Sequence, residues 1–464
     1  MIQVPDSRYQ GTTPPPADDS KHRFNRFRSP TVNFVNVLRL VWILALLHGE
    51  FIIFWKAAYQ CAPWPSSVNN NDQMLDRLLL IGDPQMTDAF SYDRPGVLLR
   101  ISEFFSDLYM GRNYRHLQRR LEPKGTIFMG DLMDGGREWD DHGWKKQATR
   151  FRHLFKSNRP QYFMAGNHDL GFGDGIQTHV MERFQGEYGP TSYTLSTGTP
   201  YSIVVVDTVS LSSSHTDLAT KRQAWDVIER HLPPQPRILM THVPLYRPPG
   251  TSCGPDRQGR SREIRQGRGY QYQNLVNAEL SRQLLDRINP VVVFSGDDHD
   301  YCLVKHGNDK DEEIPEISVP TFSMAQGMHY PGVILLDLSI TPPNTTDTQQ
   351  EEDITTAALA TKLCWLPDQI AIFIGYGCLL GLSLASLMAV HTYRWSVHRS
   401  RRAFGTNDVV GDDPVILPRP AVFTRAANAR SSSLAKRQLY SFFKDVADVA
   451  SIGILAYIIC LITL

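Results

Sequence analysis

The chain carries no net charge and contains little cysteine. Its 48 Lys and Arg side chains balance 48 Asp and Glu, so it lacks the polybasic character that nucleic-acid binding needs. Six cysteines in 464 residues exclude a small disulfide scaffold, and 42% apolar side chains exclude wholesale disorder. No internal repeat is apparent in the sequence. These absences leave one large globular domain with accessory segments.

The charges that are present are unevenly spread. Residues 1–30 carry five Lys and Arg against three acids, residues 391–445 carry ten against four, and residues 57–390 carry 31 against 39. Basic flanks of apolar segments stay on the cytoplasmic side of a membrane. The charge pattern therefore predicts cytoplasmic ends around a middle part on the opposite side.

Three apolar runs are candidates for the crossings. Leu366–Val390 has a single acid near its start and is long enough to span ~30 Å of hydrocarbon. Val449–Leu464 has only 16 uncharged residues, about 24 Å of helix, which is short for a span. Val35–Trp55 is interrupted by two charged residues and a histidine, so it fits either a span or a buried helix. Its position and polarity exclude a simple cleaved signal peptide.

Taken as three spans, these runs predict a multi-pass topology. The segments are a cytoplasmic tail 1–34, a first span 35–58, a lumenal linker 59–75, a lumenal domain 76–340, a second lumenal linker 341–365, a second span 366–390, a cytoplasmic loop 391–445 and a third span 446–464. The N-glycosylation sequon Asn344-Thr345-Thr346 falls on the lumenal side, which agrees with this orientation. Disulfides persist there, and three pairings are open to the four cysteines outside the spans, Cys61, Cys253, Cys302 and Cys364.

Within residues 76–340, short apolar runs alternate with helical patterns, which is typical of a sheet with layered helices. Strands are predicted at Arg77–Ile81, Thr126–Met129, Gln161–Met164, Tyr201–Val206, Arg237–Met240, Val291–Phe294 and Val333–Leu338. Helices are predicted at Val97–Leu117, Trp144–Phe155, Thr220–His231 and Leu275–Arg287.

Polar clusters follow most of these strands. In chain order they are D-x-Q at 83–85, G-D-x-x-D-G-G at 130–136, G-N-H-D at 166–169, His242, and G-D-x-H at 296–299. Ligand sites in open α/β sheets collect at strand carboxyl ends. A dinuclear metal site for phosphate-ester hydrolysis needs one carboxylate that bridges two cations, with further Asp, Asn and His ligands. One such cluster alone is usually a turn, but five in order predict this kind of site.

The order resembles the calcineurin-type metallophosphoesterase superfamily, whose pattern is D-x-H, G-D-x-x-D, G-N-H-D/E, H and G-H-x-H. The resemblance covers about residues 77–340 and implies an α/β fold, a four-layer αββα sandwich, here with about three transmembrane helices. The D-x-Q variant, the segment Phe294–Cys302 and the spans resemble more narrowly the fungal cell division control protein 1 family and its animal relatives, post-GPI attachment to proteins factor 5. That resemblance implies removal of ethanolamine phosphate from a mannose of glycosylphosphatidylinositol (GPI) anchors.

The resemblance also implies a role for each matching residue. The first of two divalent metal ions would be held by Asp83, Gln85, Asp131 and His299, and the second by Asp131, Asn167, His242 and Asp297. His168 would donate a hydrogen bond or proton to the phosphate and its leaving oxygen, and Asp134 would orient that histidine or a metal-bound water.

Two residues depart from the superfamily pattern. Gln85 replaces one histidine and Asp297 replaces another, and both exchange imidazole for hard oxygen, which favours Mn²⁺ over Zn²⁺. Asp298 or Asp300 could be the ligand in place of Asp297.

The implied location is the endoplasmic reticulum membrane, with cycling to the Golgi left open. The implied partners are the membrane and GPI-anchored proteins or the GPI glycolipid, with no nucleic acid. Two alternatives remain: a lumenal phosphatase for soluble nucleotides or phosphoproteins, and an inactive cargo-binding scaffold. The arginine-rich segment Cys253–Tyr272 is either a solvated loop or a clamp for an anionic glycolipid, and a Cys253–Cys302 pair that fixes the last ligand loop is also open.

Overall fold

The computed structural model describes the chain except residues 1–29, 66–74, 93–95, 308–312, 339–358, 405–422 and 464. Most of the predicted cytoplasmic tail and the Asn344 sequon lie outside the described residues. The chain forms two compact units. The larger consists of residues 47–377 with 462–464, and the smaller consists of residues 1–46 with 378–461.

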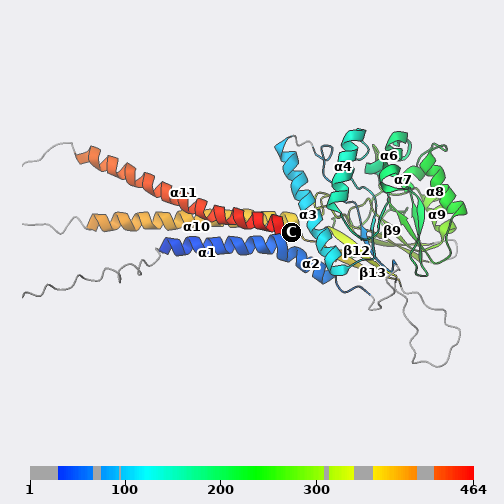
Figure 1. Cartoon of the computed structure of the whole chain (residues 1–464), viewed down its shortest axis with the longest axis horizontal. Helices are drawn as coiled ribbons and strands as arrows, with labels where there is room; N and C mark the ends of the chain where they lie inside the picture. Colours follow the sequence, from blue (N-terminus) through cyan, green and yellow to red (C-terminus); the bar gives the residue numbers. More distant parts are fainter. Residues whose placement is uncertain are drawn as a thin grey trace, which may run out of the picture. The chain divides into compact units, whose positions relative to one another are not determined.

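Two sheets form the centre of the larger unit (Figure 1). The first has the strand order β13-β12-β1-β2-β3, and β1, β2 and β3 are parallel. Its strands are β1 (Arg77–Ile81), β2 (Gly125–Phe128), β3 (Gln161–Phe163), β12 (Gly332–Asp337) and β13 (Ala360–Trp365).

The second sheet has the order β10-β11-β9-β6-β5-β4, and β5, β6, β9 and β11 are parallel. Its strands are β4 (Tyr193–Ser196), β5 (Ser202–Val206), β6 (Arg237–Thr241), β9 (Pro290–Ser295), β10 (Cys302–Gly307) and β11 (Glu313–Ser318). A separate hairpin is formed by β7 (Arg268–Gly269) and β8 (Tyr272–Gln273).

The alternation of side chains along β1 explains why the two sheets stack. Leu78 and Leu80 are fully buried in an apolar cluster that also contains Met240 of the second sheet, whereas Leu79 and Ile81 belong to the cluster beneath the helices. Successive residues of a strand point to opposite faces, so both faces of this strand are covered.

Helices cover the outer face of each sheet. Phe128 of β2 contacts Tyr114 of α3 at 6.3 Å and Phe151 of α4 at 5.2 Å between ring centroids, while α8 and α9 contribute Val227 and Leu284 to the same cluster as Leu239 of β6. The helices of this unit are α3 (Val97–Leu121), α4 (Asp141–Leu154), α5 (Asn167–Leu170), η3 (Gly173–Gly175), α6 (Thr178–Tyr188), α7 (Thr208–Leu211), α8 (Ala219–Arg230) and α9 (Ala278–Ile288). The predicted α/β four-layer αββα sandwich is confirmed.

The seven predicted strands and four predicted helices are all present, with ends shifted by a few residues. Helices α5, α6 and α7 and strands β4, β7, β8, β10, β11 and β13 were not predicted. The last of these corrects a boundary, because residues 360–365 pair with β12 in the first sheet and do not belong to the predicted linker 341–365. Thr361 and Lys362 interrupt the apolar pattern of β13, which lies at the sheet edge and has only one neighbouring strand.

Three helical segments are long and apolar enough to cross a membrane, as predicted: Asn33–Cys61, Gln369–Val397 and Lys436–Ile462. They belong to α1 (Pro30–Leu47), η2 (His48–Ile52) and α2 (Ile53–Cys61) in the first case, and to α10 (Gln369–Phe404) and α11 (Phe423–Thr463) in the others. The third helix begins well before Val449, which removes the shortfall in length that the sequence suggested.

The charged residues that interrupt the first run have partners. In the smaller unit, Arg39 lies 3.5 Å from the Asp448 carboxylate and donates to the Asp448 carbonyl at 3.1 Å. In the larger unit, Glu50 forms an ion pair with Arg112 of α3, and both side chains are only 1% exposed. Ionisable residues within membrane spans pair with one another, so these interruptions are compatible with a span.

Candidate active site

The predicted ligands converge because the strands before them are parallel. Asp83 and Asp131 follow β1 and β2, and His242 and Asp297 follow β6 and β9. Parallel strands bring their carboxyl ends to one edge, and stacking of the two sheets brings the two edges together. Asp83, Asp131 and His242 are at most 1% exposed.

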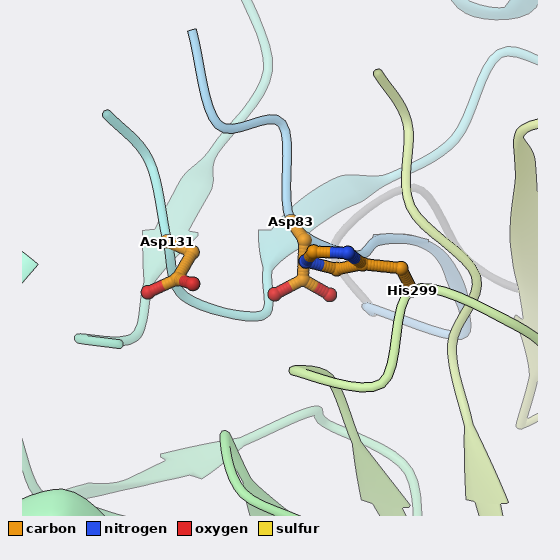
Figure 2. Close-up of side chains that lie close together, drawn as sticks. All are labelled: Asp83, Asp131 and His299. Atoms are coloured by element: carbon orange, nitrogen blue, oxygen red, sulfur yellow. The ribbon is translucent and has the colours of Figure 1, made fainter. Parts of the chain in front are cut away.

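Two groups of carboxylates and imidazoles have the spacing of metal ligands. Asp83, Asp131 and His299 each offer an atom within 4.8 Å of the others, and so do Asp131, His242 and Asp297. Figure 2 shows the first group, which comes from three separate loops. Asp131 belongs to both groups, so its carboxylate has the position of a bridging ligand.

The two predicted amide ligands lie at the same place. Gln85 donates from Nε2 to Asp131 Oδ2 at 3.0 Å, and its buried Oε1 has no hydrogen-bond partner. Asn167 donates from Nδ2 to the Gln271 carbonyl at 3.1 Å, while its Oδ1 lies 3.3 Å from His242 Nε2. The Gln85 oxygen is therefore available to a cation, which would supply the partner that it lacks, and the Asn167 oxygen lies beside the predicted ligand His242.

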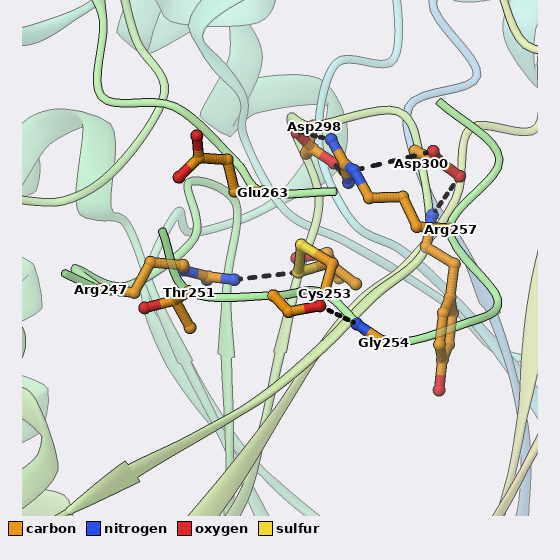
Figure 3. The surroundings of a disulfide bond; sticks show 12 residues. Arg247, Thr251, Cys253, Gly254, Arg257, Glu263, Asp298 and Asp300 are labelled. Atoms are coloured by element: carbon orange, nitrogen blue, oxygen red, sulfur yellow. Dashed lines mark hydrogen bonds and ion pairs between the residues drawn. A yellow bond between two sulfur atoms is a disulfide. The ribbon is translucent and has the colours of Figure 1, made fainter. Parts of the chain in front are cut away.

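The last motif contains three aspartates, Asp297, Asp298 and Asp300. Of these, Asp297 belongs to the ligand group with Asp131 and His242. Asp298 instead forms a two-point ion pair with Arg257 (Figure 3). Asp300 accepts hydrogen bonds from the backbone N–H groups of Gln258 and Gly259. Carboxylates that already neutralise a guanidinium or cap a loop have less capacity for a metal.

The catalytic candidate His168 is held from two sides. Its backbone N–H donates to Asp131 Oδ1 at 2.9 Å, and its Nδ1 lies 2.6 Å from the Asp134 carbonyl and 3.1 Å from the Asp134 carboxylate. A carbonyl only accepts, so Nδ1 carries a proton and Nε2 is left for a substrate. Burial disfavours the charged ring, but Asp131 and Asp134 raise the pKa of His168 to about 9.

The ligand loops have strained backbones. The described chain has eight residues other than glycine with positive φ, and five of them are predicted ligands: Asp83, Gln85, Asp131, Asp297 and His299. Such conformations cost of order 1–3 kcal/mol each and cluster at functional sites, where the surroundings enforce them.

Two glycines permit the close approach of these loops. A Cβ on Gly130 would collide with the His242 ring, and a Cβ on Gly166 would collide with Asp131. The G-D and G-N motifs therefore have a steric reason in addition to their ligand residues.

The electrostatics of the site fit divalent cations. Burial raises the pKa of Asp83 well above its usual range and that of Asp297 to about 7, and Asp131 adds to both shifts. Burial alone would raise the pKa of Asp131 too, but His242 and His168 hold it below its usual range. Three carboxylates packed this closely, two of them fully buried, are stabilised in their charged form by positive charge, which two metal ions would supply.

Some functional residues were not assigned a role from the sequence. Asp169 accepts hydrogen bonds from the backbone N–H of Leu132 at 3.1 Å and of Gly166 at 3.0 Å, so it joins the Asp131 loop to the Asn167 loop. In the sequence, only its place as the last residue of the G-N-H-D motif pointed to Asp169. Asp88, which accepts from Gly135 N–H and Trp139 Nε1 at 2.9 Å, gave no signal in the sequence.

The arginine-rich segment Cys253–Tyr272 is attached to the loops of the site. A disulfide joins Cys253 to Cys302, three residues after His299, and Gln271 at the other end accepts from Asn167 (Figure 3 shows the disulfide end). This pairing settles one of the open cysteine alternatives. The segment is thus attached to ligand loops at both ends, as a clamp beside the site would be.

The chain is similar to known proteins both in a family profile and over most of its sequence. The profile described as Calcineurin-like phosphoesterase matches residues 76–301. Cell division control protein 1 of Saccharomyces cerevisiae is 31% identical over 423 residues, covering 87% of this chain and 84% of its own length. Metallophosphoesterase 1 of Ailuropoda melanoleuca is 26% identical over 376 residues, covering 75% and 87%.

Among solved structures, a dimetal phosphatase from Danio rerio covers 57% of this chain and 93% of its own, at 12% identity and a TM-score of 0.33. That score is too low to carry an argument. The profile match, in contrast, contains all nine predicted site residues, Asp83, Gln85, Asp131, Asp134, Asn167, His168, His242, Asp297 and His299.

Proposed function

Because this chain belongs to the calcineurin-like phosphoesterase family and is a metal-dependent phosphoesterase, we propose that it is a membrane-bound phosphodiesterase that removes ethanolamine phosphate from a mannose of GPI anchors. The observation that carries the proposal is the pair of ligand groups sharing Asp131, in a chain with three candidate membrane spans. A catalytic domain tethered at a membrane suits a lipid-linked substrate. The proposed location is the lumenal side of the endoplasmic reticulum membrane, with cycling to the Golgi.

The chain's own residues account for the handling of the leaving group. When bound, two divalent cations supply stabilisation of the charge on the phosphate oxygens. His168 keeps one proton at Nδ1 on the Asp134 carbonyl, so its Nε2 proton is free to pass to the departing sugar oxygen. Asp134 then stabilises the orientation of the ring.

Mn²⁺ is the proposed metal because the donor set is poor in nitrogen. Gln85 and Asp297 offer oxygen where the superfamily pattern has histidine, and carboxylate and amide oxygens suit Mn²⁺ better than Zn²⁺. Purified protein should be most active with Mn²⁺, and changing both residues to histidine should move the preference toward Zn²⁺. Equal activity with both metals before and after the change would contradict the assignment.

The substrate is tested by mass spectrometry of GPI glycans. Cells that lack this protein should accumulate glycans with one additional ethanolamine phosphate, and wild type but not Asp131→Asn should remove it. Unchanged glycans would reject the GPI substrate. Turnover of soluble nucleotides or phosphopeptides at the same rate as lipid-linked diesters would support the soluble-substrate alternative instead.

A further inference from the structure

Helix α3 carries an exposed apolar face at its N-terminal end. Val97, Leu98, Ile101 and Phe104 are 71%, 62%, 46% and 48% exposed. Their spacing places them on one side of the helix. Outside the candidate spans, the other large apolar residues that are exposed in the described chain, such as Val291 and Leu303, are not grouped in this way along a helix face. A contiguous exposed apolar face usually marks a contact with a partner or a membrane.

The same helix contacts the chain where it enters two candidate spans. Phe105 packs against Phe373 with ring centroids 5.2 Å apart, and Phe54 packs against Tyr109 at 5.9 Å. Tyr109 also donates to the Pro367 carbonyl at 2.9 Å. Phe54 and Phe373 lie within candidate spans, so this part of α3 lies at the level where those helices enter the bilayer (Figure 1 shows α3 beside α2).

Three arginines follow toward the C-terminal end of α3, of which Arg119 is exposed, Arg115 is half-buried and Arg112 is buried. Arg112, Arg115 and Arg119 lie on the side of the helix that carries Ile101. Among the described residues Arg115 and Arg119 have no ion-pair partner, and Arg112 leaves Nε and Nη2 without a hydrogen bond although it is paired with Glu50. Burial lowers the pKa of Arg115, and the neighbouring Arg119 and Arg112 lower it further.

We propose that α3 is a membrane-surface helix, with Val97, Leu98, Ile101 and Phe104 inserted among lipid acyl chains and Arg115 and Arg119 bound to anionic headgroups. An apolar face beside basic side chains is the pattern of helices that lie in the bilayer interface. The contact fixes the catalytic domain against the bilayer. It goes beyond the proposed activity and does not depend on the substrate being a GPI anchor.

Depth-dependent quenching tests the insertion on the full chain. The background is a chain with Cys378 and Cys460 changed to serine. Ile101→Cys or Phe104→Cys is added, and the new cysteine is labelled with an environment-sensitive fluorophore. The labelled protein is placed in vesicles of phosphatidylcholine and phosphatidylserine. Lipids with a spin label on the acyl chain should remove most of the fluorescence at both sites. The controls are Val291→Cys and Leu303→Cys, which are both 42% exposed and should lose little.

A second experiment tests the proposed binding of Arg115 and Arg119 to anionic headgroups. Arg115→Gln with Arg119→Gln should reduce quenching at position 104 in anionic vesicles and leave it unchanged in neutral ones, whereas Arg230→Gln with Arg282→Gln should change neither. Quenching at 101 and 104 no greater than at 291 and 303 would overturn the proposal. Protection of 101 and 104 from both the lipid quencher and aqueous iodide would overturn it as well, because it would indicate a protein partner on this face.

Discussion

At the scale of single residues, Asp131 has the largest expected effect because its carboxylate belongs to both ligand groups. Asp131→Asn should abolish hydrolysis and reduce the bound metal at both positions. His168→Ala should lose on the order of 10²–10⁴ in rate, the usual size of an acid–base contribution, and keep both metals. Metal content by mass spectrometry, measured beside activity, separates the two roles. An empty site in His168→Ala would show that this histidine is a ligand.

The adjacent aspartates of the last motif provide a matched pair. Asp297→Ala should remove activity and weaken metal binding, because Asp297 lies in the group with Asp131 and His242. Asp298→Ala should keep both metals and affect stability, because it removes the two-point partner of the nearly buried Arg257 and leaves it only the Asp300 carboxylate, 3.9 Å from Nε. Phosphodiester hydrolysis and metal content should be measured on both variants. Full activity in Asp297→Ala with none in Asp298→Ala would reverse the assignment.

The sequence predicted one site from the five polar clusters because each cluster follows its own apolar strand. It could not choose among Asp297, Asp298 and Asp300, because the choice depends on Arg257, which lies 41 residues away from Asp298 along the chain. Contacts of this range appear only once the fold is known. The same limit concealed Asp169 and Asp88, whose partners are backbone N–H groups of other loops.

At the scale of elements, β11 connects two of the ligand loops through hydrogen bonds to one of its side chains. Its fully buried Glu316 accepts from Leu245 N–H at 3.1 Å, three residues after His242, and from Ser295 Oγ at 2.7 Å, two residues before Asp297. Arg247 at 2.9 Å balances its charge. The carboxylate therefore links the ends of β6 and β9.

This network predicts a dependence of stability on pH. Burial would raise the pKa of Glu316, but Arg247 and hydrogen bonds from His306 and Ser295 hold it at about 2, below its usual 4.5. A lowered pKa stabilises the folded state above pH 4.5, and that contribution is lost as the pH falls from 4.5 toward 2. Glu316→Gln should cost about 3–5 kcal/mol at neutral pH, and the difference from wild type should shrink across that window.

Unfolding free energies measured as a function of pH test this expectation. Glu313→Gln is the control, since Glu313 lies on the same strand in an exposed pair with Lys305 and should cost no more than about 1 kcal/mol. A constant difference between wild type and Glu316→Gln from pH 7 to pH 3 would contradict the role of the ionised carboxylate.

The same residue explains why β11 was not predicted. Glu313, Pro315 and Glu316 interrupt the apolar pattern of the strand, and Glu316 is acceptable in the core only because Arg247 and His306 meet it there. In β10 the alternation of buried residues is regular, but one of the buried positions is His306. Strands whose buried positions are all apolar were predictable, whereas β10 and β11 bury charged or polar side chains that depend on such partners.

At the scale of the whole molecule, the three candidate spans were visible from composition. The doubt about the first came from Arg39, His48 and Glu50. The two charged residues, Arg39 and Glu50, have partners that lie far along the chain, Asp448 and Arg112 respectively. A mean hydropathy counts each charged residue as though it had no partner. Their actual cost depends on pairing, which only the folded helices reveal.

The orientation across the membrane is tested by two modifications on opposite sides. Basic residues near the N-terminus and after the second span predict that both are cytoplasmic, and this places residues 59–365 in the lumen. In intact microsomes, Asn344 should then carry a glycan that an endoglycosidase removes and Asn344→Gln lacks, while protease should cleave a tag at the N-terminus. The Cys253–Cys302 disulfide agrees with an oxidising compartment for the catalytic domain. A protected N-terminal tag together with an unglycosylated Asn344 would reverse the orientation, and the catalytic domain would then face a compartment in which that disulfide is not expected to persist.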